Sequence, residues 1–514
     1  MKRFLIIICC LLFVSYSVAQ TSKVNKTVHD GETYDVTTDE TFVDVSIESG
    51  GVLTVKSGAT LTVTGTLDSP NVTCLIIEDG GQLINGDGGF PGSSGVYATV
   101  RKNITSFNEE NQSGWYTLSS PLASSTTNIS SVDGLVQSNG SEYLYDLYRY
   151  AEKQTNMEWQ SALIEHKPPF SSIDIGRGYL YASTVDDHIC TFAGVLQYEQ
   201  VYSANFVTYA SSNQALKGWN LIGNPYPHNI YKGKYGANDC GITPTNIISG
   251  YYIVDINGGF IVHEDNQPIA PCQAVLIKLS DKLGTGANSN KLMFNKTTHA
   301  PSGSKDSNVK SLQIDVNGIE RHDRAFVFCD EEDGLDKMDH VSELIPSLSI
   351  YYENKKYAIA HIGNNSSSFD VLFKNTQAGF YTLSVDTRGN SFGYLHLIDN
   401  FTGEEIDLLE EPNYKFYAFG NEGDGRFRII LNPNGIDSEE SEFAYISNGE
   451  IIITGLNGNA TLQVFDVMGR LINEEVVCGT SGMICRANKP NTTGVYLLRM
   501  MVNEDVKTQK LIVE

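Results

Sequence analysis

The chain has 514 residues, of which 41% are hydrophobic and 19% charged, a composition typical of globular proteins with a hydrophobic core. Its 61 acidic residues against 36 basic ones give a formal net charge of -25. Because nucleic acids are bound through clustered lysine and arginine, this charge excludes the common classes of nucleic-acid-binding protein. An acidic surface also keeps exported proteins soluble, and the length predicts about three or four domains.

The first residues predict export. Residues 1–3 carry two positive charges, residues 4–14 are apolar, and residues 17–19 form a small-x-small cleavage site, which is the pattern of a secretory signal peptide. Cleavage is expected between Ala19 and Gln20. No later stretch approaches the roughly 18 consecutive apolar residues of a membrane-spanning helix. We therefore expect an exported protein without a transmembrane segment after removal of the signal.

The cysteines do not form a disulfide framework. Nine are present, and two of them lie in the signal peptide, so the mature chain keeps an odd and widely spaced set. Cys478 and Cys485 flank the Gly-Thr-Ser-Gly turn at 479–482 and are the one pair expected to meet. They form either a disulfide or two half-buried thiols.

The segment 20–95 repeats itself at short range. Ser-Gly-Gly-Val-Leu-Thr-Val at 49–55 is followed by Ser-Gly-Ala-Thr-Leu-Thr-Val at 57–63, and Asp-Gly-Gly-Gln-Leu at 79–83 resembles both. Short Leu and Val strands separated by glycine corners are typical of a parallel β-helix, whose coils bury their inward rows against one another. A small β-solenoid is predicted, and a series of two-strand hairpins is the alternative.

Residues 96–304 contain one pattern twice. A Gly-Trp pair is followed by a proline seven residues after the glycine, then by a tyrosine-rich strand and a closing apolar strand. The preserved order predicts a duplicated β unit. The corresponding segments of the first and second copies are 114–121 and 218–225, 143–150 and 250–255, and 175–181 and 269–277.

Several aromatic side chains of the duplicated units are candidates for ligand binding, because flat aromatic rings stack on the apolar faces of sugars. The candidates are Trp115, Tyr148, Tyr150, Trp159 and Trp219. The alternative is that these residues fill the core of the β units, as aromatic residues in strands usually do. The core interpretation is favoured for each residue taken singly, and a binding platform would require Tyr148 and Tyr150 to be exposed together.

Residues 305–431 predict an antiparallel β-sandwich, because short apolar strands alternate with Asn, Gly and Asp turns along this segment. Within it, 334–348 is expected to form a short helix. Residues 432–441, with proline, glycine and several acids, are expected to form a linker that proteases can cut.

An acidic cluster in this segment is a candidate metal site. Its members are Asp330, Asp333, Asp336 and Asp339. Carboxylate oxygens close in sequence suit Ca²⁺, although the spacing does not match an EF-hand. The alternative, which is favoured, is a solvated acidic loop at the end of a strand, and no other cofactor is expected.

The last stretch, 442–514, carries three motifs in order: DVMGR at 466–470, GVY at 494–496 and KTQKLIV at 507–513. Together they resemble the type A C-terminal sorting domain of the type IX secretion system of Bacteroidota. The resemblance implies an immunoglobulin-like β-sandwich that the secretion machinery recognises. The implied signal residues are Asp466, Gly469, Arg470, Gly494, Tyr496, Lys507 and Lys510.

Two other segments resemble parts of secreted proteins from the same bacteria. Residues 305–431 are similar to the β-sandwich module that often precedes this sorting domain. The string GWNLIGNPYP at 218–227 resembles a motif of large secreted proteins. Both resemblances imply a multidomain surface protein.

Local signatures of catalysis are missing from the sequence. Neither the HExxH zinc motif nor the GxSxG nucleophile motif occurs. We therefore expect an all-β, non-enzymatic protein that is attached to the outer-membrane surface or released. Its β modules would bind an extracellular glycan or protein. The alternatives are a secreted polysaccharide hydrolase with a carboxylate pair in the duplicated region, and a structural spacer.

Overall fold

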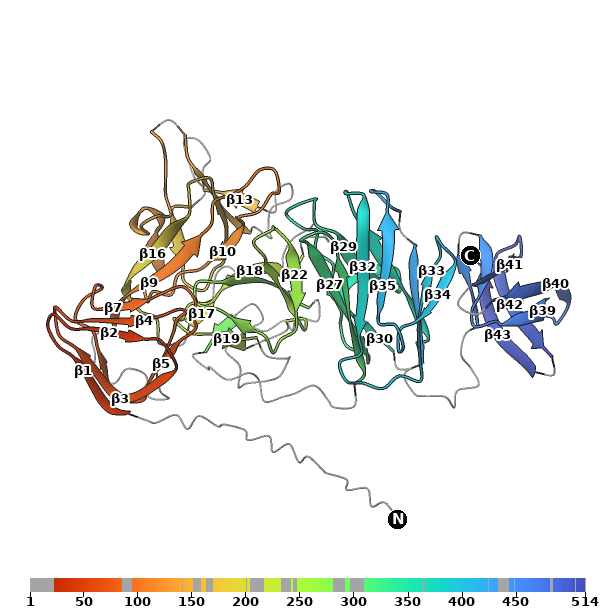
Figure 1. The fold of residues 1–514 in the computed structure, drawn as a ribbon, viewed down its shortest axis with the longest axis horizontal. Coiled ribbons are helices and arrows are strands. Elements are labelled where there is room, and N and C mark those ends of the chain that lie inside the picture. Colours follow the sequence, from red (N-terminus) through yellow and green to blue (C-terminus); the bar gives the residue numbers. More distant parts are fainter. Residues whose placement is uncertain are drawn as a thin grey trace, which may run out of the picture. The chain divides into compact units, whose positions relative to one another are not determined.

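The computed structural model describes residues 23–85, 95–140, 142–150, 159–162, 170–199, 201–203, 217–232, 242–243, 247–280, 292–295, 309–363, 366–423, 425–432, 443–447, 449–480, 484–503 and 505–513. The regular structure in this part of the chain is made of β-strands, apart from one short 3-10 helix at Ile129–Ser131 (Figure 1). No α-helix occurs among the described residues. The predicted all-β class is confirmed. The expected signal peptide, with its predicted cleavage site at Ala19 and Gln20, and most of the expected linker lie outside the described residues.

The chain divides into two compact units. One comprises residues 1–101 with 193–198, and the other comprises residues 102–192 with 199–514. Across the described residues we find no helix with the length and apolar character needed to cross a membrane.

The N-terminal segment is a two-sheet parallel β-solenoid. Strands alternate between a sheet ordered β1-β3-β5-β8, with β6 beside β3, and a sheet ordered β16-β9-β7-β4-β2. Successive coils pair in parallel, with Thr33 opposite Val52 and Ile76 opposite Thr99. The strands are β1 (Lys23–Val28), β2 (Thr33–Val36), β3 (Glu40–Ile47), β4 (Val52–Val55), β5 (Thr60–Val63), β6 (Leu67–Asp68), β7 (Leu75–Ile77), β8 (Gln82–Asn85), β9 (Tyr97–Ile104) and β16 (His188–Val195).

The parallel pairing confirms the predicted solenoid and excludes the series of hairpins. The sequence echo between 49–55 and 57–63 corresponds to β4 and β5, which lie in different sheets. The short repeat therefore marks the two strands of one coil rather than two successive coils. Leu53, Val55 and Leu61 are fully buried, so the solenoid is stabilised by an inward apolar row.

The duplication of the β unit is visible in the sheet topology. The first copy has a sheet ordered β10-β15-β12-β13 and a ribbon β11-β14, and the second has β18-β24-β21-β22 and β19-β23, so each strand has a counterpart. The first-copy strands are β10 (Tyr116–Leu118), β11 (Thr126–Asn128), β12 (Tyr145–Tyr150), β13 (Trp159–Ser161), β14 (Ser172–Asp174) and β15 (Tyr179–Ser183). The second-copy strands are β18 (Trp219–Gly223), β19 (Ile230–Tyr231), β21 (Tyr251–Val254), β22 (Phe260–His263), β23 (Pro268–Ile269) and β24 (Ala274–Lys278). A further sheet, β17-β25-β20, contains Val201–Ser203, Leu292–Phe294 and Ile242–Thr243.

The two copies approach each other through small residues. A Cβ atom added at Gly178 would lie 2.4 Å from the Cβ of Ala274, and one added at Gly223 would lie 2.3 Å from the Cβ of Ser119. Across this contact, Thr117 Oγ1 donates to the carbonyl oxygen of Ala274 at 2.8 Å. Gly223, the second glycine of the GWNLIGNPYP string, is thus required by close packing of the two copies.

The next segment is one sheet folded around a single core, and the predicted sandwich strands are present. Its strand order is β34-β33-β36-β31-β29-β30-β27-β26-β32-β35, with β28 beside β30, and residues from both halves share one hydrophobic cluster. The strands are β26 (Ser311–Asn317), β27 (His322–Cys329), β28 (Leu335–Asp336), β29 (Ser347–Tyr352), β30 (Lys355–Ile362), β31 (Ser368–Lys374), β32 (Gly379–Asp386), β33 (Tyr394–Asp399), β34 (Glu404–Asp407), β35 (Asn413–Ala418) and β36 (Phe427–Asn432).

The C-terminal segment is a two-sheet sandwich. A sheet ordered β37-β38-β41 faces a sheet ordered β40-β39-β42-β43 across a common core. The strands are β37 (Ala444–Ser447), β38 (Glu450–Ile453), β39 (Gly458–Asp466), β40 (Leu471–Gly479), β41 (Cys485–Asn488), β42 (Gly494–Val502) and β43 (Asp505–Val513).

The second β unit and the following sandwich share a hydrophobic core. Members of this cluster from the two segments include Trp219, Tyr252, Phe260, Phe326, Leu335 and Ile359. The two segments are therefore packed together through apolar side chains, and the sandwich is not an isolated module.

The predicted helix at 334–348 is wrong. Its residues form the short strand β28, then turns, and then the start of β29. Tertiary hydrogen bonds replace the helical ones: Tyr252 Oη donates to the carbonyl of Asp336 at 2.9 Å, and the backbone N–H of Val341 donates to the carbonyl of Gly258 at 2.9 Å. Polar groups of the backbone in this segment thus find hydrogen-bond partners in the neighbouring β unit.

A buried carboxylate anchors the same segment. Asp323 is fully buried and accepts hydrogen bonds from Lys337 Nζ and from the backbone N–H of Leu348 at 2.6 Å. His340 Nε2 lies 3.2 Å from the Asp323 carboxylate, and His340 Nδ1 accepts from the N–H of Phe260 at 3.0 Å. Asp323 therefore ties the 335–348 segment to β27.

We predict that Asp323→Ala lowers the free energy of unfolding by about 3–5 kcal/mol, because Lys337 and His340 would stay buried without their counter-charge. Chemical denaturation measures this change. Glu450→Ala, which removes an exposed ion pair with Arg486, is the control and should cost less than about 1 kcal/mol. An equal loss of unfolding free energy in the two variants would contradict the role of Asp323 as a buried anchor.

The same network predicts a pH dependence. Burial alone would raise the pKa of Asp323, but Lys337 and His340 lower it to about 2. A carboxyl group with a lowered folded-state pKa stabilises the fold above its unfolded value of about 3.9. Its contribution should therefore be lost as the pH falls from about 4 towards 2, and Asp323→Ala should show a shallower loss over that range.

Candidate functional site

A polar pocket lies beside the segment that follows β27. Its volume is about 650 Å³, and it is lined by four lysines, four carboxylates, two tyrosines and His361 among others. The lysines and carboxylates balance in number, and Lys278 forms an ion pair with Asp336. Because the lining is charged, the pocket suits a polar or ionic ligand better than an apolar one.

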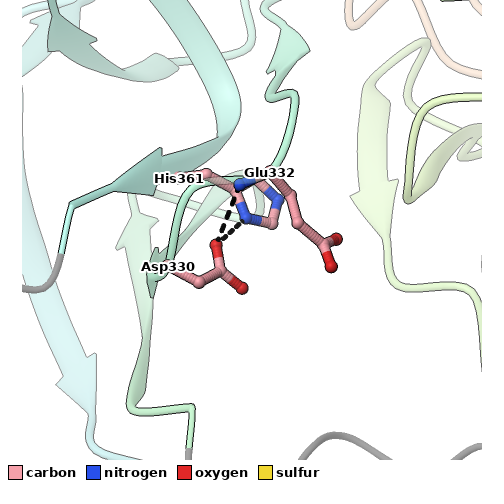
Figure 2. A group of neighbouring side chains, drawn as sticks. All are labelled: Asp330, Glu332 and His361. Carbon is pink, nitrogen blue, oxygen red and sulfur yellow. Dashed lines mark hydrogen bonds and ion pairs between the residues drawn. The ribbon is translucent and has the colours of Figure 1, made fainter.

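One group of side chains at this pocket could hold a metal ion. Asp330, Glu332 and His361 each offer one ligand atom, and these atoms lie within 4.8 Å of one another. Figure 2 shows the His361 ring between the Asp330 carboxylate and the Glu332 side chain. The Nδ1 atom of His361 contacts Asp330 Oδ1, and Phe328 stacks on the ring with centroids 5.2 Å apart.

The strand register explains this convergence. β27 and β30 pair in parallel, with Phe328 opposite His361, so the ring of His361 lies against Phe328. Asp330 follows directly after β27, where the chain leaves the sheet and its carboxylate can turn towards His361. His361 is not predictable from the sequence, because it lies 31 residues after Asp330 and the two are brought together by the parallel pairing of β27 with β30.

The predicted group of four aspartates is not assembled. Of the four, Asp330 alone belongs to the metal-competent group among the described residues. Asp336 pairs with Lys278, and Asp333 accepts a hydrogen bond from Ser280 at 3.3 Å. Asp339 is exposed further along the segment. The structure therefore does not bring the four candidate Ca²⁺ ligands together, because Asp333 and Asp336 contact Ser280 and Lys278 instead.

The five predicted ligand-binding aromatics gather at one hydrophobic core. Trp219 is 2% exposed and belongs to the core, and Trp115, Tyr148, Tyr150 and Trp159 pack against it partly buried. Trp159 stacks on Phe260 with centroids 6.4 Å apart and meets Tyr150 edge-on at 5.2 Å. Tyr148 and Tyr150 are not exposed together, so the packing favours the core interpretation over a glycan platform.

An exposed aromatic row lies elsewhere, on the sandwich of residues 311–432. We call Phe380, Phe401, Tyr417 and Phe419 the aromatic row, and each is at least 41% exposed. Phe380 lies opposite Tyr417 on β32 and β35, with ring centroids 5.2 Å apart, and Tyr417 meets Phe419 at 5.0 Å. Lys415 Nζ lies 4.9 Å from the Phe380 ring.

The sequence carries a signal for the aromatic row. The string Lys-Phe-Tyr-Ala-Phe at 415–419 is apolar at both odd and even positions. Successive side chains of a strand point to opposite faces of the sheet, and here one face packs on the core. Phe416 and Ala418 are therefore buried, whereas Tyr417 and Phe419 are exposed.

The DVMGR motif forms a tight exposed turn after β39. Asp466 Oδ1 accepts hydrogen bonds from the backbone N–H groups of Met468 and Arg470, both at 2.9 Å, and its Oδ2 lies 2.6 Å from Arg470 Nε. These bonds, with the backbone N–H of Arg470 first, lower the pKa of Asp466. Gly469 adopts φ +76°, a conformation that favours glycine. The motif thus fixes the shape of a turn on the surface.

The other predicted signal residues divide into buried and exposed groups. Tyr496 is buried, and its hydroxyl donates to the carbonyl of Thr492 at 2.9 Å. Gly494 begins β42 opposite Val513, and Lys507 and Lys510 are exposed on β43. Tyr496 therefore has a structural position, whereas the turn and the lysines are accessible.

An apolar surface lies on the outward side of the C-terminal four-stranded sheet. We call Phe465, Leu471, Val495, Leu497 and Ile512 the outer apolar face. Strand register places Phe465 between Leu471 and Leu497, and Val495 opposite Ile512. Except for the half-buried Phe465, each is at least 40% exposed. This face adjoins the Asp466–Arg470 turn.

Cys478 and Cys485 are not joined in the structure. Both are free, and Cys485 Sγ lies 3.0 Å from the carbonyl oxygen of Cys478. The alternative of two thiols therefore describes this pair. Burial raises the pKa of Cys485, whereas Cys478 is exposed.

A comparison with protein families matches part of the chain. A family model described as a domain of unknown function (DUF8693) matches residues 18–253, which contain the solenoid and the duplicated unit as far as β21. No curated protein matches the chain. Function must therefore be argued from the residues themselves.

We predict that iodoacetamide labels Cys478 of the native, reduced protein much faster than Cys485, because Cys478 is exposed whereas Cys485 is buried and burial raises the pKa of its thiol. Peptide mass mapping measures the two rates, and unfolding the protein should make them similar. Protection of Cys478 that reductant removes would instead indicate the disulfide.

Proposed function

We propose that this chain is an exported, non-enzymatic surface protein that the type IX secretion system delivers through its C-terminal sandwich, residues 443–513. The observation that carries this proposal is the exposed DVMGR turn beside the outer apolar face. A contiguous exposed apolar patch on a folded domain is typical of a surface that docks a partner. The partner proposed here is the secretion machinery.

The position of the signal residues supports this assignment. Asp466 and Gly469 hold the turn, while Met468 is 79% exposed at its tip. A turn fixed by internal hydrogen bonds presents its neighbouring side chains in one conformation, which lowers the entropic cost of recognition. The outer apolar face, which adjoins this turn, adds apolar surface that a partner would bury.

The β modules would then bind an extracellular ligand, a glycan or a protein, at the cell surface. The aromatic row supports this part of the proposal, because exposed aromatic rings with an adjacent cation are enriched at binding surfaces. Lys415, whose Nζ lies 4.9 Å from the centre of the Phe380 ring, supplies such a cation.

The hydrolase alternative has less support. Among the described residues, burial raises the pKa of the carboxyl groups of Asp265 and Asp370. Each lies against a cation, Lys232 and Arg428 respectively. A glycosidase acid instead faces a second carboxyl group across the substrate. These two residues are better explained as buried ion pairs.

We expect that deleting residues 441–514 retains the protein in the periplasm, because the docking surface is lost. The double variant Leu497→Glu with Ile512→Glu should reduce surface delivery at least tenfold, because it places charge on the outer apolar face. Cell fractionation and immunoblotting measure both effects.

The matched control is Gln463→Glu with Thr508→Glu, which adds the same charge to a polar row of the same sheet. It should be delivered normally. Normal surface display of the deletion would contradict the sorting assignment, and equal defects in the two double variants would contradict the role of the apolar face.

For the ligand, we predict that Phe380→Ala with Phe419→Ala lowers retention on a glycan array or an immobilised matrix protein by about tenfold, since each lost ring removes stacking of about 0.5–1.5 kcal/mol. Thr382→Ala, on the same face of β32, is the control and should bind as the parent does. Unchanged retention in the double variant would exclude the aromatic row as the binding surface.

A further inference from the structure

The sandwich of residues 311–432 has an apolar row on the outward side of β33 and β36. Leu397 of β33 and Ile429 of β36 belong to the core of this sandwich. Because successive side chains of a strand point to opposite faces of the sheet, the next residues, Ile398 and Ile430, face outward. Both are nevertheless buried, with exposed fractions of 0% and 3%. Another part of the chain therefore covers this face.

The C-terminal sandwich carries a matching row on β37 and β38. Ala444 and Ile451 belong to its own core, so the neighbouring Tyr445 and Ile452 face outward, and they lie opposite each other in the strand register. Their exposed fractions are 6% and 0%. They form one hydrophobic cluster with the two outward isoleucines of β33 and β36. The outward faces of the two sheets thus bury each other.

Hydrogen bonds between the two sandwiches accompany this apolar contact. Tyr445 Oη donates to Asn400 Oδ1 at 3.0 Å, and Arg486 Nη2 donates to the carbonyl oxygen of Asn400 at 3.1 Å. The backbone N–H of Gly455 donates to Glu405 Oε2 at 3.0 Å. Because these bonds come from both side chains and backbone, they fix the position of one sandwich on the other.

The carboxylate of Glu405 is prepared for this contact by its own sandwich. It accepts a hydrogen bond from Tyr394 Oη at 2.9 Å, and His396 Nδ1 lies 3.0 Å from it. Burial alone would raise the pKa of Glu405, but the hydrogen bonds from His396, Gly455 and Tyr394 lower it. Glu405 is therefore ionised at neutral pH, and a hydrogen bond to an ionised acceptor is stronger than one to a neutral acceptor.

We propose that this contact is an interaction surface that holds the C-terminal sandwich, residues 443–513, on the preceding sandwich without the covalent connection between them. Dissociation would return the apolar rows of both sheets to water, which opposes it. If a protease cuts the expected linker at 432–441, the C-terminal sandwich therefore stays bound to the rest of the chain. The contact uses the sheet β37-β38-β41, so the outer apolar face on the other sheet remains accessible.

The test replaces residues 433–441 of the full chain with the recognition sequence of a site-specific protease. After complete cleavage of the purified protein, size-exclusion chromatography at micromolar concentration should show both fragments in one peak. Ile452→Glu and Ile430→Glu, on opposite sides of the contact, should each move most of the C-terminal fragment into a separate, later peak. Both residues lie outside the cores of their own sandwiches, so the variants should fold, and circular dichroism checks this.

The matched control is Val476→Glu. Val476 lies on β40 in the other sheet of the C-terminal sandwich and is 74% exposed, so its fragments should elute together as those of the parent do. Separate elution of the two parent fragments would overturn the proposal. Complete co-elution of the fragments in the folded Ile452→Glu and Ile430→Glu variants would also overturn it.

Discussion

The burial of Asp323 is the constraint on which the centre of the molecule depends. A carboxylate removed from water must be compensated by cations and N–H donors, and here Lys337, His340 and the backbone of Leu348 supply them. Lys337 and His340 lie on the segment between β28 and β29, and Leu348 lies at the start of β29. That segment in turn forms hydrogen bonds with Tyr252 and Gly258 of the second β unit. One charged group thus specifies how a loop, a sandwich and a neighbouring sheet fit together.

The pattern of the sequence predicted the features that depend on local periodicity. Glycine corners between Leu and Val strands predicted the solenoid, and the repeated order of Trp, Tyr and closing strands predicted two sheets that share one topology. The same reasoning failed at 334–348, because helix propensity is weak compared with the tertiary hydrogen bonds available there. It also could not place His361 beside Asp330, since parallel pairing joins residues that have no sequence relation.

The aromatic residues show a second limit of sequence reasoning. Trp115, Tyr148, Tyr150, Trp159 and Trp219 were recognised as one group, and they do meet at one core. Whether a ring lies inside or outside depends on which face of each strand the rest of the fold covers. Phe380 and Tyr417 have the same residue types and the same strand setting, yet they remain exposed. Composition alone could not separate the two sets.

The close contact between the two β copies has an evolutionary consequence. Gly178 and Gly223 leave no room for a side chain, and the atoms that would clash with one belong to the opposite copy. A duplicated gene segment normally lets one copy drift while the other keeps its role. Here a mutation at the contact in either half alters the fit of both, so the pair would be inherited, lost or recombined as a single block.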